Sequence, residues 1–179
     1  CIPSKTWADK VLPDVAEEKR VEELWDLIFK IVRVDGADPD KAWDEFENTI
    51  QEKATYLNEM QFEKLHYRSK LGTDLTIEMP KNHLWIGGSS MSETGVRFTA
   101  NIPTEEIFSA PKRDGVNGIV YATKPLSLSG KLVENFSLRF ENGKCVEVKA
   151  EKNQKLLEDL IATDENACML GEVALVKND

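Results

Sequence analysis

The sequence predicts an α+β fold in which a pair of helices comes first and short strands follow. Up to about Met60, apolar residues recur every three or four positions, which is the period of a helix with one buried face. From Lys64 onward, apolar and polar residues alternate, which is the period of a strand with one buried face. An Asn142-Gly143 pair between two alternating segments adds a β-hairpin. A helical pair followed by a region rich in short strands is typical of an α+β fold.

The first predicted helix begins at Asp14, whose carboxylate can cap it while Glu17 returns the hydrogen bond three residues later. One face of this helix is apolar and contains Val21, Leu24, Trp25, Ile28 and Val32. Asp38-Pro39 then supplies the cap and the first-turn proline of a second helix that ends near Met60. Its apolar face contains Trp43, Phe46, Ile50 and Leu57. We interpret both faces as packing surfaces, because aromatic residues at helical spacing form cores far more often than ligand sites.

The strand region begins in DLTIEMP, where Leu75, Ile77 and Met79 alternate with polar residues. The polar, glycine-bounded stretch GGSSMSETG at residues 87–95 is expected to be an exposed loop or a boundary between two units. After the hairpin, we expect a helix from about Lys152 to Ala162 and then a strand in LGEVALV. The opening residues, CIP, are interpreted as part of a strand, and both chain ends as cuts within a longer sequence.

The charge balance argues against nucleic-acid binding. The 179 residues include 32 acidic and 23 basic side chains, a net charge of −9, with no basic stripe that would attract phosphates. No window approaches the roughly 18 consecutive apolar residues of a membrane span, and the start lacks the layout of a secretion signal. Cys1, Cys145 and Cys168 form no CxxC pair, which predicts neither a disulfide framework nor a zinc knot and favours a reducing cytoplasm.

Few residues indicate catalysis by themselves. His66 and His83 are interpreted as surface or hydrogen-bonded structural histidines, because a zinc site built on them needs a third ligand. Glu105 and Glu106 follow a strand-like segment, although PTEE is also an ordinary helix start with Thr104 as its cap. Glu172 stands between apolar neighbours in LGEVALV, where a buried carboxylate requires a cation such as a divalent metal or an arginine.

Three long segments resemble successive stretches of the aminopeptidase T/aminopeptidase S family of metallopeptidases. They are GTDLTIEMP, TANIPTEEIFSAPKRDGVNGIVYATKPLSLSGKLVENFSLRF and LIATDENACMLGEVALV. The resemblance implies that residues 1–90, with the helical pair and short strands, are the latter part of an amino-terminal α/β domain. It implies that residues 91–179 are the first, β-rich part of the catalytic domain. The implied activity is hydrolysis of the amino-terminal residue from peptides, in the cytoplasm, by a homodimer when complete.

Members of this family bind two divalent metal ions, zinc or cobalt, and the resemblance places the first two glutamate ligands at Glu106 and Glu172. A two-metal hydrolase needs carboxylates that balance about four positive charges and hold a water near both ions. Glu105 is the competing register for the first ligand. The remaining histidine and aspartate ligands and a catalytic tyrosine are expected in sequence after Asp179. We therefore expect this chain alone to be inactive and to bind metal weakly at most.

Two other functions stay open at this stage. The chain could be a non-catalytic binding or interaction module that retains the aminopeptidase fold. Finding the histidine and aspartate ligands in a longer reading frame would reject this alternative. It could also be a hydrolase with a nucleophilic cysteine, but neither Cys145 nor Cys168 has a histidine nearby in the sequence.

Overall fold

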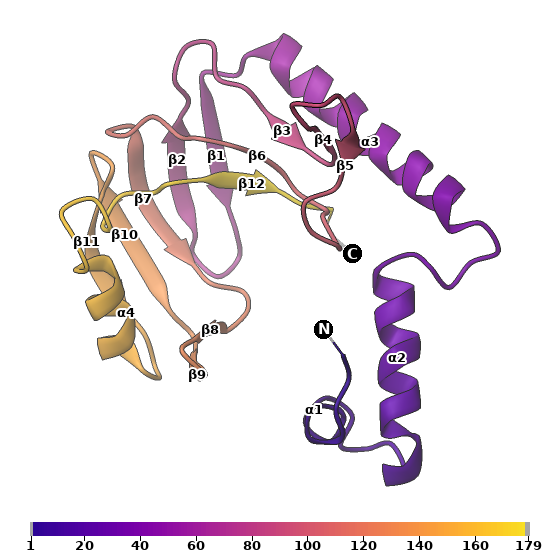
Figure 1. Cartoon of the computed structure of the whole chain (residues 1–179). Coiled ribbons are helices and arrows are strands. Elements are labelled where there is room, and N and C mark those ends of the chain that lie inside the picture. Colours follow the sequence, from indigo (N-terminus) through magenta and orange to yellow (C-terminus); the bar gives the residue numbers. More distant parts are fainter. Residues whose placement is uncertain (1, 178–179) are drawn as a thin grey trace. The chain divides into compact units, whose positions relative to one another are not determined.

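The structure, a computed structural model, describes residues 2–177 and divides into two compact units. One unit contains Cys1–Lys53 and Gly87–Glu106, and the other contains Ala54–Ile86 and Ile107–Asp179. Figure 1 labels the helices and strands along the chain. Helices predominate in the first unit and strands in the second, which confirms the predicted α+β class. The boundary at residues 90 and 91 concerns the domains of the longer family members and stays a prediction.

The first unit begins with a short helix that the sequence analysis missed. No strand forms at Ile2 and Pro3, where one was expected, and Cys1 lies outside the described residues. Instead, α1 (Lys5–Val11) starts after Ser4, whose hydroxyl oxygen accepts a hydrogen bond from the Trp7 backbone N at 3.2 Å. Serine is among the preferred N-cap residues, so Ser4 was the available signal.

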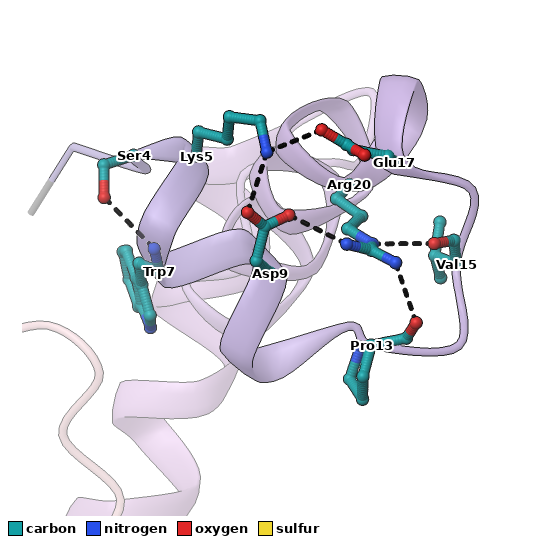
Figure 2. Close-up of polar contacts among 8 residues, drawn as sticks. All are labelled: Ser4, Lys5, Trp7, Asp9, Pro13, Val15, Glu17 and Arg20. Atoms are coloured by element: carbon teal, nitrogen blue, oxygen red, sulfur yellow. Dashed lines mark hydrogen bonds and ion pairs between the residues drawn. The ribbon is translucent and has the colours of Figure 1, made fainter.

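The second helix starts later than predicted, because a side chain holds the preceding segment in a loop. α2 (Arg20–Ile31) follows a 3-10 turn, η1 (Glu17–Lys19), so the predicted start at Asp14 is wrong. Figure 2 shows the Arg20 guanidinium donating to Asp9 Oδ1 at 2.9 Å and to the backbone oxygens of Val15 and Pro13 at 2.7 and 2.9 Å. These carbonyl groups are therefore engaged in tertiary contacts instead of a helical ladder.

The predicted apolar faces are confirmed in both long helices. Leu24 of α2 is buried, and the other four residues of its predicted face are half-buried. α3 (Pro39–Met60) has the predicted bounds, and the Asp38 carboxylate accepts a hydrogen bond from the Lys41 backbone N at 3.0 Å. The first unit also contains a small hairpin of β4 (Ser90–Met91) and β5 (Arg97–Phe98). It lies within and just after the stretch that was expected to be a loop.

The second unit is built on an antiparallel five-stranded sheet in the order β1-β2-β7-β10-β11. Its strands are β1 (Lys64–Arg68), β2 (Asp74–Glu78), β7 (Val116–Tyr121), β10 (Ser137–Glu141) and β11 (Lys144–Lys149). The alternation predicted for β2 is confirmed, because Leu75 and Ile77 are buried on one face. The hairpin is confirmed too: Asn142 and Gly143 have φ values of 49° and 83°, as a type I′ turn requires. A bulge between Arg139 and Phe140 shifts its register.

Smaller elements complete the second unit. A three-stranded sheet has the order β12-β6-β3, with β3 (Ile86–Gly87), β6 (Ile107–Ser109) and β12 (Val173–Leu175). β8 (Leu126–Leu128) pairs with β9 (Lys131–Val133), and α4 (Gln154–Ile161) lies beside β11 as Figure 1 shows. The largest fully buried side chains are Trp85, Val116 and Val133. No helix among the described residues is long and apolar enough to cross a membrane.

Candidate metal-binding residues

Glu106 is an exposed residue directly before β6. The strand is anchored by Ile107 and Ser109, which are 3% and 5% exposed, while Phe108 between them is half-buried. This alternation fixes where the strand begins, and it leaves the Glu106 carboxylate outside the packed region. Thr104, Glu105 and Glu106 form no helix, so the reading of PTEE as a helix start is wrong.

Glu172 is likewise exposed and lies directly before β12. The sequence analysis placed it inside an apolar strand, where a carboxylate would need a cation to offset its burial. That placement is wrong, because β12 begins only at Val173, which is 6% exposed. The carboxylate of Glu172 is therefore exposed to water and needs no cation to offset burial.

The pairing of β6 with β12 relates the two segments. The strands are antiparallel, with Ile107 opposite Leu175 and Ser109 opposite Val173. Glu106 and Glu172 each precede their own strand, so they lead into opposite ends of the pair. The strand pairing alone does not bring the two carboxylates side by side.

Glu105 has a different environment from Glu106. An ion pair joins its carboxylate to the Arg33 guanidinium of the same unit. Arg33 also lies over the Phe46 ring, with its guanidinium carbon 3.9 Å from the ring centroid, and 5.7 Å from that of Trp43. The cation is thus shared between one carboxylate and two aromatic faces, which orients Glu105 toward Arg33.

Both histidines make contacts typical of structural residues. His83 is 6% exposed, and its Nδ1 donates to the Pro80 carbonyl oxygen at 2.9 Å in the tautomer that this contact selects. His66 lies on the exposed face of β1, and its Nε2 is 2.7 Å from Asp74 Oδ1. This hydrogen bond from His66 is the main cause that lowers the pKa of Asp74. Across residues 2–177, no cluster of three or more His, Cys, Asp and Glu side chains is placed to hold a metal ion.

A buried carboxylate in the first unit was missed by the sequence analysis. Glu47 of α3 is 6% exposed, and its Oε1 accepts hydrogen bonds from the Ser89 backbone N at 2.8 Å, the Ser89 hydroxyl at 2.6 Å and Gln51 Nε2 at 3.2 Å. Burial by itself would raise the pKa of Glu47, but the hydrogen bonds from Ser89 and Gln51 outweigh it and hold that pKa below its usual value. The available signal was a glutamate on the apolar face of the helix, between Phe46 and Ile50.

Glu47 also lines an open cavity of about 250 Å³ within the first unit. The cavity wall combines one carboxylate, one guanidinium and several apolar groups, supplied by Trp43, Glu47, Ser89, Arg97, Phe98, Thr99 and Ile102. Arg97 forms an ion pair with Asp44, with Nη2 and Oδ1 3.0 Å apart. Thr99 and Ile102 belong to the same segment that leads to Glu106.

Two exposed carboxylates ahead of neighbouring strands are oxygen donors of the kind that the metal site of a hydrolase uses. Residues 1–179 match the family described as "Thermophilic metalloprotease (M29)", and the chain belongs to this family. The family predicted from the sequence segments is thereby confirmed.

Curated relatives carry aminopeptidase names. The chain is 48% identical over 176 residues to "Aminopeptidase AmpS" of Bacillus subtilis (strain 168), covering 98% of this chain and 43% of the relative. It is 47% identical over 173 residues to "Aminopeptidase T" of Thermus aquaticus, covering 97% of this chain and 42% of the relative. The chain therefore spans less than half the length of these relatives.

A solved structure has the same fold. The chain superposes on "Wild-type AmpT from Thermus thermophilus" with a TM-score of 0.89 at 43% sequence identity, covering 98% of this chain and 42% of that one. This match covers nearly the whole chain, so it supports the α+β architecture independently of the local patterns.

Proposed function

We propose that this chain supplies the first two metal ligands, Glu106 and Glu172, of a two-metal aminopeptidase that removes the amino-terminal residue from peptides. The observation that carries the proposal is that the chain belongs to a metalloprotease family. In the structure, both glutamates are exposed, and each lies directly before a strand. Buried neighbours at Ile107 and Val173 fix both strand starts and hence the backbone from which each carboxylate extends.

The contacts of Glu105 support Glu106 as the ligand. The carboxylate of Glu105 is already neutralised by Arg33, and a metal would have to replace that ion pair and its aromatic support. A carboxylate without such a partner loses less on binding a cation. The ion pair with Arg33 thus favours Glu106, and not Glu105, as the residue whose carboxylate is available to a metal ion.

The donor chemistry fits divalent zinc or cobalt, which accept carboxylate oxygens together with imidazole nitrogens. When bound, such ions polarise the peptide carbonyl and lower the pKa of a water molecule. The contribution of this chain is to hold two negative charges that balance part of the ionic charge. Because β6 and β12 begin directly after Glu106 and Glu172, the backbone of both residues is attached to a strand, which limits the motion of the two carboxylates.

Further parts of the proposal go beyond the ligands. A complete site needs donors besides the two glutamates, so the chain alone is expected to bind metal weakly and to hydrolyse nothing. The complete protein is proposed to act on peptides with a free amino terminus, as a cytoplasmic homodimer. Residues 1–90 and 91–179 would then belong to its amino-terminal and catalytic domains.

The test is hydrolysis of a dipeptide amide and of its acetylated counterpart by a polypeptide of the relatives' full length that contains this sequence. We expect metal-dependent cleavage of the free substrate only, and a loss of at least about 10³-fold in kcat for Glu106→Gln or Glu172→Gln. Full activity of both variants would contradict the assignment of ligands.

The cavity around Glu47 favours a second candidate, a binding module without catalysis. The cavity presents the Glu47 carboxylate and the Arg97 guanidinium beside apolar side chains, a lining that can bind a ligand with charged and apolar groups. If the full-length polypeptide binds peptides but cleaves none under any divalent metal, this candidate replaces the first.

A further inference from the structure

Two cysteines that lie far apart in the sequence occupy facing positions in the second unit. Lys144 at the start of β11 and Met169 form an isolated antiparallel bridge. The next residue after Lys144 and the residue before Met169 are also bonded: the Cys145 backbone N donates to the Cys168 carbonyl oxygen at 2.8 Å. In antiparallel pairing, the partner of residue 145 is therefore residue 168, and facing residues carry their side chains on the same face. Both are free cysteines and both are half-buried.

The spacing of such a pair is close to that of a disulfide. Facing residues of a hydrogen-bonded antiparallel pair have Cα atoms about 5.5 Å apart, which is inside the range of roughly 4.4–6.8 Å found in disulfides. Their Cβ atoms, at about 4.5–5.5 Å, must approach by about 1 Å to form the bond. Cys168 lies in a turn outside any regular strand, so its backbone can supply this movement.

Each thiol makes one weak hydrogen bond to a backbone oxygen. Cys145 Sγ donates to the Glu147 carbonyl oxygen at 3.5 Å, and Cys168 Sγ donates to the Glu165 carbonyl oxygen at 3.7 Å. A thiol is a poor donor, so little free energy opposes its rotation toward the other sulfur. Burial chiefly, and the adjacent Cys168 thiol to a smaller degree, raise the pKa of Cys145, in line with two thiols in one neighbourhood.

We propose that Cys145 and Cys168 form an oxidisable dithiol, which a peroxide converts into an intramolecular disulfide. One thiolate attacks the peroxide, so that an S–O bond forms, the O–O bond breaks and hydroxide leaves. The second thiolate then attacks that sulfur, the S–S bond forms, the S–O bond breaks and a second hydroxide leaves; the two protons released by the thiols convert both hydroxides to water. The peroxide takes up two electrons, and a dithiol reductant reverses the reaction.

The disulfide would act on the segment that leads to Glu172. Cys168 lies four positions before this residue, and the new bond fastens the turn to β11 while closing a loop that contains α4. The amides between Cys168 and Val173 should therefore exchange more slowly in the oxidised chain. An effect on metal affinity rests on the proposed function, whereas the disulfide itself does not.

The experiment uses the 179-residue chain with Cys1→Ser, so that only the two cysteines remain. One equivalent of hydrogen peroxide should lower the intact mass by about 2 Da, remove both reactive thiols and link the peptides that carry Cys145 and Cys168, all reversed by dithiothreitol. The matched controls, Cys145→Ser and Cys168→Ser in the same background, should yield no such species.

Oxygen adducts or dimers in place of an intramolecular disulfide would overturn the proposal. The unsubstituted chain provides a second measurement that needs no variant: its major linked peptide pair should be the same, and a pair containing Cys1 would equally count against the proposal. Because none of these readouts involves a metal or a substrate, a negative result leaves the ligand assignment to be judged by its own test.

Discussion

Replacing Gly143 by alanine should destabilise the second unit strongly. Gly143 is the second residue of the hairpin turn, with φ of +83°, a conformation that costs an alanine about 1–2 kcal/mol. An added Cβ would also overlap the Arg113 carbonyl oxygen and lie 2.8 Å from its carbon and 2.9 Å from Asp114 Cα. Both neighbours are backbone, so relief requires moving a loop, at a cost comparable to overpacking of about 1–3 kcal/mol. The sum is about 2–5 kcal/mol.

The assay is urea unfolding followed by the fluorescence of Trp85, which is 1% exposed and is the tryptophan of the second unit. Trp7, Trp25 and Trp43 are replaced by phenylalanine so that the signal reports this unit alone. Gly171→Ala is the control, since nothing lies within 4 Å of its Cβ position, and it should change the free energy by less than about 0.5 kcal/mol. If Gly143→Ala unfolds at the same urea concentration as the control, the clash argument is refuted.

Two further predictions concern the first unit. Arg20→Met removes the three Arg20 hydrogen bonds drawn in Figure 2 and should lower the free energy of unfolding, measured by thermal unfolding, by about 2–3 kcal/mol. The control is Lys41→Met, because the ion pair between Lys41 and Glu45 is 3.8 Å long and both side chains are 70% exposed. This control should change the free energy of unfolding by less than about 0.5 kcal/mol in the same measurement. Because the pKa of Glu47 is lowered in the folded state, its contribution to stability is present above its unfolded pKa of about 4.3 and is lost as the pH falls through the folded value. The stability advantage of the parent over Glu47→Gln should therefore shrink between about pH 5 and pH 3, and an advantage that grows on acidification would reverse the assigned direction.

Local patterns predicted the elements whose signals lie within a few residues of one another. The bounds of α3 follow from Asp38-Pro39 and its apolar face, and the hairpin follows from Asn142-Gly143. By contrast, the start of α2 depends on Arg20, whose guanidinium reaches back over the preceding loop to Asp9. The spacing of residue types along one sequence does not reveal such a tertiary contact.

The candidate site shows the same division. The resemblance indicated Glu106 and Glu172 as candidate ligands. The exposure of Glu172 depends on where β12 starts, and its first residue, Val173, pairs with Ser109, 64 positions earlier in the chain (173 − 109). The ion pair that gives Glu105 a different environment from Glu106 joins Arg33 and Glu105, which are 72 positions apart. The hydrogen bonds that keep Glu47 charged span 42 positions to Ser89. Local patterns and the resemblance indicated the two candidate ligands but not Glu47, and in every case long-range packing decides the environment of the residue.

Metal stoichiometry tests the central claim most directly. Bound zinc or cobalt is counted per chain, after dialysis, in a full-length polypeptide that contains this sequence and in its Glu106→Gln, Glu172→Gln and Glu105→Gln variants. Two ions are expected in the parent and in Glu105→Gln, and the loss of at least one ion in each of the other two variants. Two ions retained by both Glu106→Gln and Glu172→Gln would contradict the account.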